Sequence, residues 1–305
     1  MGFFVLVKLF NFHFAICYDV AMSWLLLTFI SVVCRALYGI MSKVLSTSAK
    51  TSAYTQATLL STVCAVLALL TTPFLGGITT NFSDVSLLTV LLVAGGQGLG
   101  NIFYFTAIKN LTNGTAQIAF SSILIFNTLL SLLFLNLHLS PINILGVLLL
   151  LIAITSVVSG KVVFDRCGVI FMIIGSFFYA VFQLSSSQLS SQVSAATYLL
   201  IAYAGGAIVV FSIKAKTIIS DLQKPGIGRA IRNSAYAALP SIGNFLFAYY
   251  AYRSAPTPAI VAILLTSQVV VTILLGYFLL NERDNVVRKF SAAILVFISA
   301  VLIKR

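Results

Sequence analysis

The stretch INILGVLLLLIAI, residues 142–154, carries no charge and does not alternate apolar with polar side chains. A membrane β-barrel strand needs that alternation, because one of its faces meets lipid and the other the lumen. A continuous apolar run is typical instead of a helix crossing the hydrocarbon core, where each backbone polar group must be satisfied within the segment. The run therefore predicts an α-helical membrane protein.

The composition of the whole chain agrees with this prediction. Of 305 residues, 60% are apolar and 8% are charged, and the mean hydropathy is +1.09. Soluble domains are about 45–50% apolar and about 25% charged. Too little polar surface remains to cover a protein in water, so we expect a polytopic protein in the lipid bilayer, without a soluble enzyme domain and without enzyme activity.

Net charge and cysteine content add two expected absences. Lys and Arg number 18 against 6 acids, a net charge of +12, but these cations lie mainly between apolar runs, where membrane topology explains them better than nucleic-acid binding does. No nucleic-acid partner is expected. The four cysteines form no CxxC pair, so neither a metal site nor a disulfide framework is predicted, and no cofactor is expected.

Apolar stretches bounded by Pro, Gly, Asn or charges predict ten membrane-spanning helices. Their expected ranges are 24–45, 52–72, 85–107, 115–137, 141–159, 168–190, 196–213, 230–252, 258–280 and 287–303. Residues 1–23 are not counted, because Lys8, His13 and Asp19 leave an uncharged run too short to cross a bilayer. We expect this segment to be interfacial or dispensable ahead of Met22.

The two halves of the chain are related by a shift of 144 positions, which pairs the first five predicted helices with the last five in order. We therefore expect two five-helix units, residues 24–160 and 161–305. Five crossings place the end of a unit on the opposite face, so the second copy must be inverted. Inverted repeats provide two nearly equivalent packings, the basis of alternating access in transporters.

The distribution of Lys and Arg predicts the orientation. The face away from the termini has thirteen of these residues, and the face with the termini has four. Both termini should therefore lie outside the cytoplasm. The expected membrane of the protein is a cell (inner) membrane. If residues 1–23 formed an eleventh span, the N-terminus alone would return to the cytoplasm.

The C-terminal segment AIVAILLTSQVVVTILLGYFLLNERDNVVRKFSAAILVFISAVLIKR, residues 259–305, and its weaker partner at residues 116–154 resemble the paired helices of EamA-type transporters. This family of the drug/metabolite transporter superfamily implies ten helices in two inverted repeats and transport of amino acids, nucleotide derivatives or other metabolites. The glutamate that closes the family's pattern is matched by Glu282 but replaced by His138 in the first half. A structural cap at the membrane surface suits both positions.

Arg35 is the residue most costly to place in lipid. It lies eleven residues from Trp24 and eight from Lys43, about 16 Å and 12 Å along a helix, hence near the midplane. All six acids fall outside or at the ends of the predicted spans, so the counter-ion of Arg35 is predicted to be the solute. The alternative is a structural arginine that helix-end carbonyls and tyrosine hydroxyls hold permanently in place. A guanidinium pairs with carboxylate or phosphate, which favours an anionic or zwitterionic solute. Without a buried acid or histidine to carry a proton, facilitated diffusion or exchange is the expected mechanism.

Other polar residues at similar depth complete the predicted substrate site. Tyr179 is the repeat counterpart of Arg35 and should face it, and Tyr38 lies one turn away. The remaining members are Gln97, Asn101, Asn127, Gln183, Ser241, Asn244, Thr266 and Gln268. For each one singly, an interhelical hydrogen bond is the better explanation of the polar residue, so the prediction concerns the cluster.

Three alternatives remain at this point. An exporter of diverse amphipathic compounds would line its cavity with aromatic residues such as Phe103, Tyr104, Phe178 and Phe182. A membrane-embedded enzyme would need clustered carboxylates or histidines at one face, which the sequence lacks. A non-transporting scaffold or receptor is the third, and no feature selects an oligomeric state.

Overall fold

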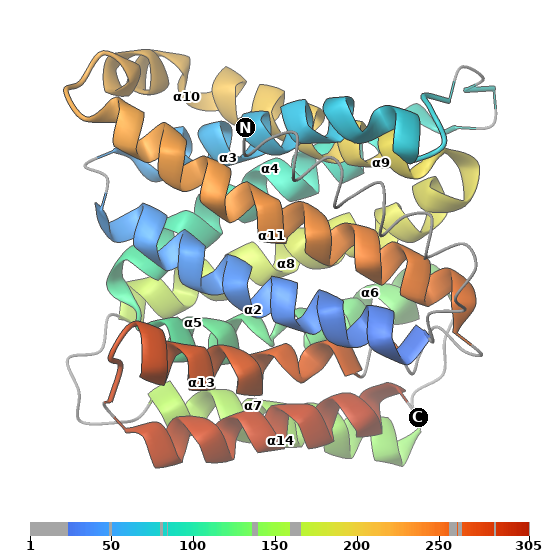
Figure 1. The fold of residues 1–305 in the computed structure, drawn as a ribbon. Helices are drawn as coiled ribbons and strands as arrows, with labels where there is room; N and C mark the ends of the chain where they lie inside the picture. The colour runs from blue at the N-terminus through green and yellow to red at the C-terminus, as the bar shows by residue number, and fades with distance from the viewer. Residues whose placement is uncertain are drawn as a thin grey trace.

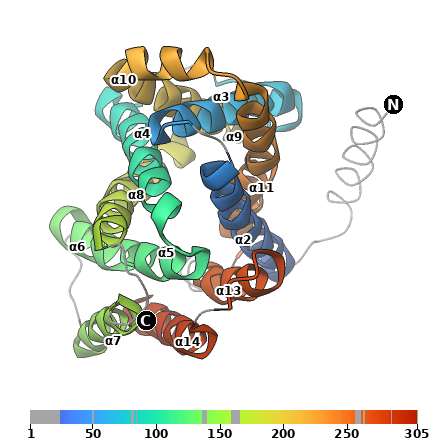
Figure 2. The ribbon, with the colours of Figure 1, turned by 90° about the vertical axis from the view of Figure 1, so that its left-hand side faces the viewer.

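The computed structural model describes residues 24–48, 51–79, 82–83, 85–135, 140–158, 166–255, 261, 264–283 and 285–304. The predicted N-terminal segment, 1–23, lies outside these ranges. All regular structure within them is helical, and the helices lie roughly side by side along one direction (Figure 1). Seen end-on in Figure 2, α7 and α14 form a pair at one edge, and the other helices surround a central region.

The first half of the chain forms seven helical elements. They are α2 (Trp24–Ser48), α3 (Ala53–Thr71), the short 3₁₀ turn η1 (Thr72–Phe74), α4 (Leu87–Asn110), α5 (Asn113–Phe120), α6 (Ile123–Leu135) and α7 (Pro141–Val158). The second half repeats this order. It contains α8 (Arg166–Gln192), α9 (Ala195–Leu200), the π-helical turn η2 (Ile201–Gly205), α10 (Gly206–Leu222), α11 (Ile227–Ser254), α13 (Gln268–Leu279) and α14 (Val286–Lys304).

Each of the ten predicted spans overlaps a helix of the described chain. Seven helical segments are long and apolar enough to cross a membrane, and two shorter apolar helices, Pro141–Ser156 and Leu264–Leu279, accompany them. The one remaining predicted range, 230–252, corresponds to α11, which is 28 residues long and carries Pro240 in its interior. The structure therefore establishes an all-helical protein with multiple apolar helices.

Two predicted helices are interrupted. The range 115–137 was expected to be one helix, but Ser121 and Ser122 form a turn that separates α5 from α6. The range 258–280 has a similar turn at Ser267, between a helical segment at 264–266 and α13. The interruptions fall at nearly equivalent places in the two halves. The overall apolarity of both ranges concealed the interruptions, because apolar character does not report the local backbone conformation.

The predicted span 196–213 was too short at its C-terminal end. Helical structure continues to Leu222, and the backbone of Lys214 is non-helical (φ −140°, ψ 42°), where the helix bends. Lys214 and Lys216 are exposed there. The composition located the end of the apolar run at this point. The helix itself continues beyond the apolar run, because solvent can hydrate the polar side chains of its last turns.

The helix pairings follow a two-fold pattern. Extensive packing joins α2 with α11 and α8 with α4, which are equivalent pairs under exchange of the halves. The same exchange relates α2·α13 to α8·α6 and α3·α11 to α10·α4. Exchange of the halves maps α3 onto α10 and α7 onto α14, and each of these two pairs packs together. This arrangement fits a two-repeat layout.

Hydrogen bonds between helix ends show how the two halves are oriented. Ser52, which caps the start of α3, donates its N–H to Asp221 near the end of α10 (2.8 Å). Ser194, which caps the start of α9, donates its hydroxyl to the Gly77 carbonyl beyond the end of α3 (2.7 Å). The second helix of each half therefore runs antiparallel to its equivalent, as inverted repeats require.

Glycines in α4 permit close approach of α8. A Cβ atom on Gly96 would lie 2.9 Å from the Phe178 carbonyl oxygen, and one on Gly100 would lie 2.8 Å from the Tyr179 ring. These positions admit no larger side chain without movement of α8. The glycine-rich run thus serves helix packing, as small residues in membrane helices commonly do.

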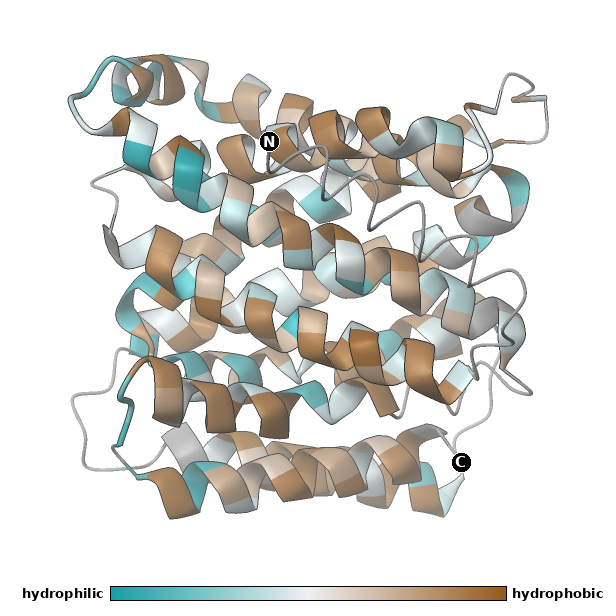
Figure 3. Cartoon of the chain, in the orientation of Figure 1, coloured by the Kyte–Doolittle hydropathy of each residue, from teal (hydrophilic) through white to brown (hydrophobic). Residues whose placement is uncertain are grey.

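Polar residues gather at the ends of the helices. Figure 3 shows apolar colouring along most helices and hydrophilic colouring at the connection between α10 and α11. Exposed cations lie there, including Lys224, Arg229 and Arg232. This distribution is that of a multi-pass integral membrane protein, with one end rich in positive charge.

Candidate solute site

Arg35 lies halfway along α2 and is half-buried. Its guanidinium carbon is 5.2 Å from the centre of the Tyr38 ring and 5.1 Å from the centre of the Phe120 ring. Both distances are within the range of cation–π attraction, which strengthens where water is excluded. Two aromatic faces thus stabilise the guanidinium without neutralising its charge.

Tyr179 and Arg35 both contact the Phe120 ring. The Phe120 and Tyr179 rings meet edge to face, with centroids 5.3 Å apart. The Tyr179 hydroxyl donates a hydrogen bond to Asn101 Oδ1, and Asn101 Nδ2 donates to Ser61 Oγ at 3.2 Å. The structure therefore brings together the predicted residues Arg35, Tyr38, Asn101 and Tyr179, with Phe120 between the two repeat counterparts.

A second aromatic layer supports this group from α4. The Tyr104 ring stacks on the Tyr38 ring with centroids 6.0 Å apart, and its hydroxyl accepts a hydrogen bond from Gln117 Nε2 at 3.1 Å. Tyr104 also meets Phe120 edge to face at 6.0 Å. We call Arg35, Tyr38, Asn101, Tyr104, Phe120 and Tyr179 the arginine cluster.

Sequence reasoning missed the roles of Phe120, Gln117 and Ser61. Phe120 is the last residue of α5, directly before the Ser121-Ser122 turn. That pair of small hydroxyl residues within an apolar span was the available signal for a helix break, and hence for a residue at its edge. Tyr104 had been considered only as lining for amphipathic compounds.

The described residues place no carboxylate against Arg35. An ion pair joins Lys224 Nζ to Asp221 Oδ1 at 2.6 Å, at the end of the bundle. Glu282 instead accepts backbone hydrogen bonds from Asn113 (2.7 Å) and Gly114 (3.3 Å) at the start of α5. The expected structural cap is therefore what Glu282 forms, and its counterpart His138 lies outside the described residues.

Other predicted residues connect helices near the cluster. The Tyr203 and Ser241 hydroxyls are 2.8 Å apart, which links η2 to α11. The Ser31 hydroxyl contacts the backbone carbonyl of Asn244 at 2.9 Å and its Oδ1 at 3.1 Å, which links α2 to α11. The Ser241 hydroxyl and the Asn244 Oδ1 accordingly have partners within the protein.

Asn127 and Gln183 form a separate pair. Asn127 Nδ2 donates to Gln183 Oε1 at 2.7 Å, between α6 and α8, and Gln183 is exposed. Among the described residues, no hydrogen bond connects this pair to the arginine cluster. The two residues thus show the interhelical bond that the sequence offered as the alternative reading.

The last three predicted residues have different surroundings. Gln97 is buried in α4, and its Oε1 has no hydrogen-bond partner among the described residues. Thr266 and Gln268 are half-buried on either side of the turn at Ser267. An acceptor without a donor and a broken helix are both features that a polar solute can use.

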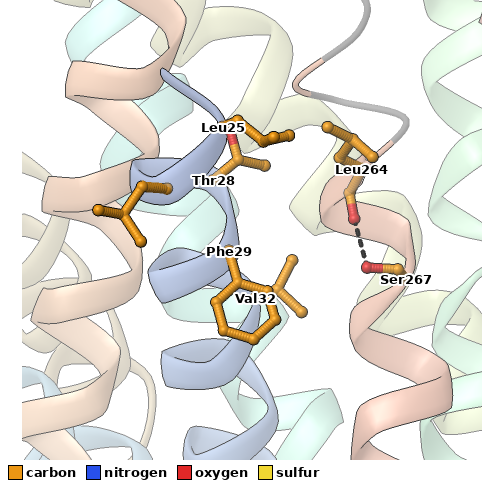
Figure 4. Close-up of a pocket in the computed structure, with 7 residues that line it drawn as sticks. Leu25, Thr28, Phe29, Val32, Leu264 and Ser267 are labelled. Carbon is orange, nitrogen blue, oxygen red and sulfur yellow. Dashed lines mark hydrogen bonds between the residues drawn. The ribbon is translucent and has the colours of Figure 1, made fainter. Parts of the chain in front are cut away.

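An apolar crevice of about 420 Å³ opens between α2 and the interrupted helix (Figure 4). Its lining residues are Leu25, Leu26, Thr28, Phe29, Val32, Leu264 and Ser267. Val32 lies one helical turn from Arg35. Pockets of this volume are within the range that holds small molecules.

The aromatic residues of the alternative exporter site are divided among different contacts. Phe103 and Phe178 stack on each other at 5.5 Å, while Phe182 packs against Tyr198 and Phe245. Within the described ranges, no three His, Cys, Asp or Glu side chains come together in a way that could hold a metal ion.

Comparison with known proteins identifies the family. No curated protein matches the sequence. A solved structure entitled only "Crystal structure of protein" shares the fold, with a TM-score of 0.62 and 13% identity over 91% of this chain and 94% of that chain. The model of the EamA-like transporter family matches residues 22–159 and again residues 166–305, which confirms the resemblance. The chain therefore belongs to the EamA-like transporter family.

Proposed function

We propose that this family member moves a small, anion-bearing solute, such as an amino-acid-like metabolite, by facilitated diffusion or exchange. The observation that carries the proposal is Arg35, placed at the middle of α2 against two aromatic rings and without an acidic neighbour among the described residues. A carboxylate or phosphate on the solute supplies the missing negative charge.

The proposed mechanism is alternating access by the two repeat units, residues 24–160 and 161–305. Arg35 from the first unit and Tyr179 from the second hold the solute from opposite sides of Phe120. Rocking of the units then exposes the cluster to one face and afterwards to the other. The end rich in Lys and Arg is cytoplasmic in this proposal, and the membrane is a cell (inner) membrane.

The test is exchange of labelled metabolites in liposomes containing the purified protein. Arg35→Ala should abolish exchange while the folded protein remains, and Arg35→Lys should retain part, because the point charge remains but the fork of donors is lost. Arg229→Ala removes an exposed cation from the start of α11 and serves as the matched control, with exchange near that of the wild type.

Exchange by Arg35→Ala equal to the wild type would overturn this site. Counterflow of lipophilic cations instead of amino acids would favour the amphipathic exporter. A protein that moves no solute from a broad metabolite pool would favour a scaffold or receptor.

A further inference from the structure

We propose that the solute passes between the arginine cluster and the Lys/Arg-rich end along the contact between α2 and α5, and that Ser42 and Asn113 bind it there. This inference rests on the proposed function, because it takes Arg35 as the anion site of the solute. It adds two binding residues and the route on which they lie, which is closed in this structure.

One face of α2 meets one face of α5 from the arginine cluster toward the Lys/Arg-rich end. At the cluster, the centre of the Phe120 ring lies 5.1 Å from the Arg35 guanidinium carbon. One turn further along α2, a Cβ atom on Gly39 would lie 3.1 Å from Gln117 Nε2 and 3.6 Å from Asn113 Oδ1. Asn113, Gln117 and Phe120 are spaced by four and three residues, which places them on one face of α5. The two amides of α5 therefore continue directly from the cluster.

Ser42 lies on the same face of α2, three residues beyond Gly39. Its hydroxyl lies next to the Tyr38 and Tyr104 hydroxyls of the arginine cluster, but not at hydrogen-bonding geometry. The serine thus connects the cluster to the amides of α5. We define the α2–α5 seam as Gly39, Ser42, Asn113 and Gln117.

The two proposed binding residues are buried polar side chains without hydrogen-bond partners. Ser42 and Asn113 are each 0% exposed. Within the described ranges, Ser42 Oγ and both polar side-chain atoms of Asn113 have no partner. Burial removes water from a polar group, and this costs free energy unless another group replaces the water. A solute with a donor and an acceptor besides its acid group, as an amino-acid-like metabolite has, supplies these partners when it enters the seam.

Buried cations lie at the far end of the seam. Lys43 is half-buried, and its Nζ donates to two carbonyl groups at the end of α4 at 2.7 Å each. Lys289 of α14 is 4% exposed, and its Cδ would lie 3.2 Å from a Cβ atom on Gly114 at the start of α5. Glu282 brings one negative charge to the same place. Because the two cations outweigh this charge, the far end of the seam attracts an anion.

The helices α2 and α5 pack only lightly against each other. The main partner of α2 is α11, whereas α5 packs mainly on α13 and α8. In the end-on view, both helices border the central region (Figure 2). Separating α2 from α5 therefore breaks few contacts, which permits the seam to open and close.

The first measurement tests whether the seam opens, and it needs no knowledge of the solute. The four native cysteines are replaced by alanine, Ser42→Cys is added, and the protein is treated with the anionic reagent 2-sulfonatoethyl methanethiosulfonate. A thiol reacts appreciably only where water lets it ionise. Ser299→Cys is the matched control, because Ser299 is also 0% exposed and its hydroxyl donates to the Leu295 carbonyl within α14. We expect Ser42→Cys to react at least tenfold faster, and equal rates would overturn the route.

The second measurement tests binding at the seam with Asn113→Leu in the liposome exchange assay. Exchange should fall at least tenfold, or about 1.4 kcal/mol. The melting temperature should equal or exceed that of the wild type, because the side chain has no hydrogen bond to lose. Asn143→Leu is the control: Asn143 Nδ2 donates to the Leu302 and Ile303 carbonyls at 3.0 and 3.2 Å, between α7 and α14. It should lower the melting temperature by about 2–4 °C and leave exchange within twofold of the wild-type rate.

Exchange by Asn113→Leu at the wild-type rate, or a loss of stability as large as that of Asn143→Leu, would contradict the binding role. A reactive Ser42→Cys thiol combined with normal exchange by Asn113→Leu would assign the seam to water alone and would also refute binding. Should Asn113→Leu not fold, Ser42→Ala takes its place. Its exchange should fall about threefold at an unchanged melting temperature, and normal exchange would then refute the proposal.

Failure of the route can be distinguished from failure of the proposed function. If Arg35→Ala abolishes exchange but the seam variants do not, the anion site stands and the route fails. If the wild type exchanges no metabolite, the proposed function fails and solute binding at the seam fails with it. The reaction rate of Ser42→Cys still decides in that case whether the seam opens.

Discussion

The two ends of the bundle cap equivalent helices with different chemical groups. At the end rich in Lys and Arg, Asp221 receives the Ser52 N–H (2.8 Å), the Thr55 hydroxyl (2.6 Å) and Lys224 Nζ (2.6 Å). At the opposite end, Thr79 Oγ1 receives the Ser194 N–H at 2.8 Å, with no charge involved. Equivalent helices are therefore capped by a carboxylate at one end and by hydroxyls at the other.

The two kinds of cap differ in the strength of their hydrogen bonds. Hydrogen bonds to a charged group contribute about 1.5–3 kcal/mol, against about 0.5–1.5 kcal/mol for neutral ones. Glu282 adds a second carboxylate, at the start of α5. The carboxylate-capped contacts therefore join the two halves more strongly than the hydroxyl contacts do. The following substitutions measure this difference as losses in the free energy of unfolding.

Asp221→Ala should have the largest effect, lowering the free energy of unfolding by about 2–3 kcal/mol. Asp221 is buried, and its loss leaves the Ser52 N–H and the Thr55 hydroxyl without their acceptor. The melting temperature in detergent measures the loss. Lys224→Ala is the control and should cost no more than about 0.5 kcal/mol, because the Lys224 side chain is 53% exposed. Equal effects of the two substitutions would contradict the carboxylate cap.

Glu282→Ala should be next, with a loss of about 1–2 kcal/mol, because two backbone N–H groups at the start of α5 lose a charged acceptor. Glu282→Gln keeps an acceptor and should recover about half. Thermal unfolding of both variants in parallel provides the comparison. A Gln variant less stable than the Ala variant would contradict a capping role.

Ser194→Ala should have the smallest effect, about 1 kcal/mol, through loss of a neutral N-cap. The Ser194 hydroxyl accepts from the Thr197 N–H at 3.3 Å and donates to the Gly77 carbonyl at 2.7 Å. Ser52→Ala is the equivalent change at the charged end, and there the Asp221 carboxylate still receives the Ser52 N–H. A larger loss for Ser194→Ala than for Asp221→Ala would reverse the proposed ranking of the two ends.

Part of the candidate site could be predicted from the repeat spacing and from the depth of residues along their helices. The shift of 144 positions paired Arg35 with Tyr179, and depth along the helix added Tyr38 and Asn101; the structure brings these four together. Asn127 and Gln183 satisfied the same criterion but bind each other and not the cluster. Depth in the membrane does not state which hydrogen-bond partner a polar side chain has, and the partners separated the two groups.

The amino-acid sequence alone determined the membrane location, the approximate helix ranges and the duplication, because hydropathy and repeat spacing are properties of the chain. Tertiary structure decided where helices break, which pairs pack, and that Phe120 stands between Arg35 and Tyr179. These features arise from contacts between segments that are distant in sequence. The crevice beside Val32 is of the same kind, since one wall belongs to each half of the chain.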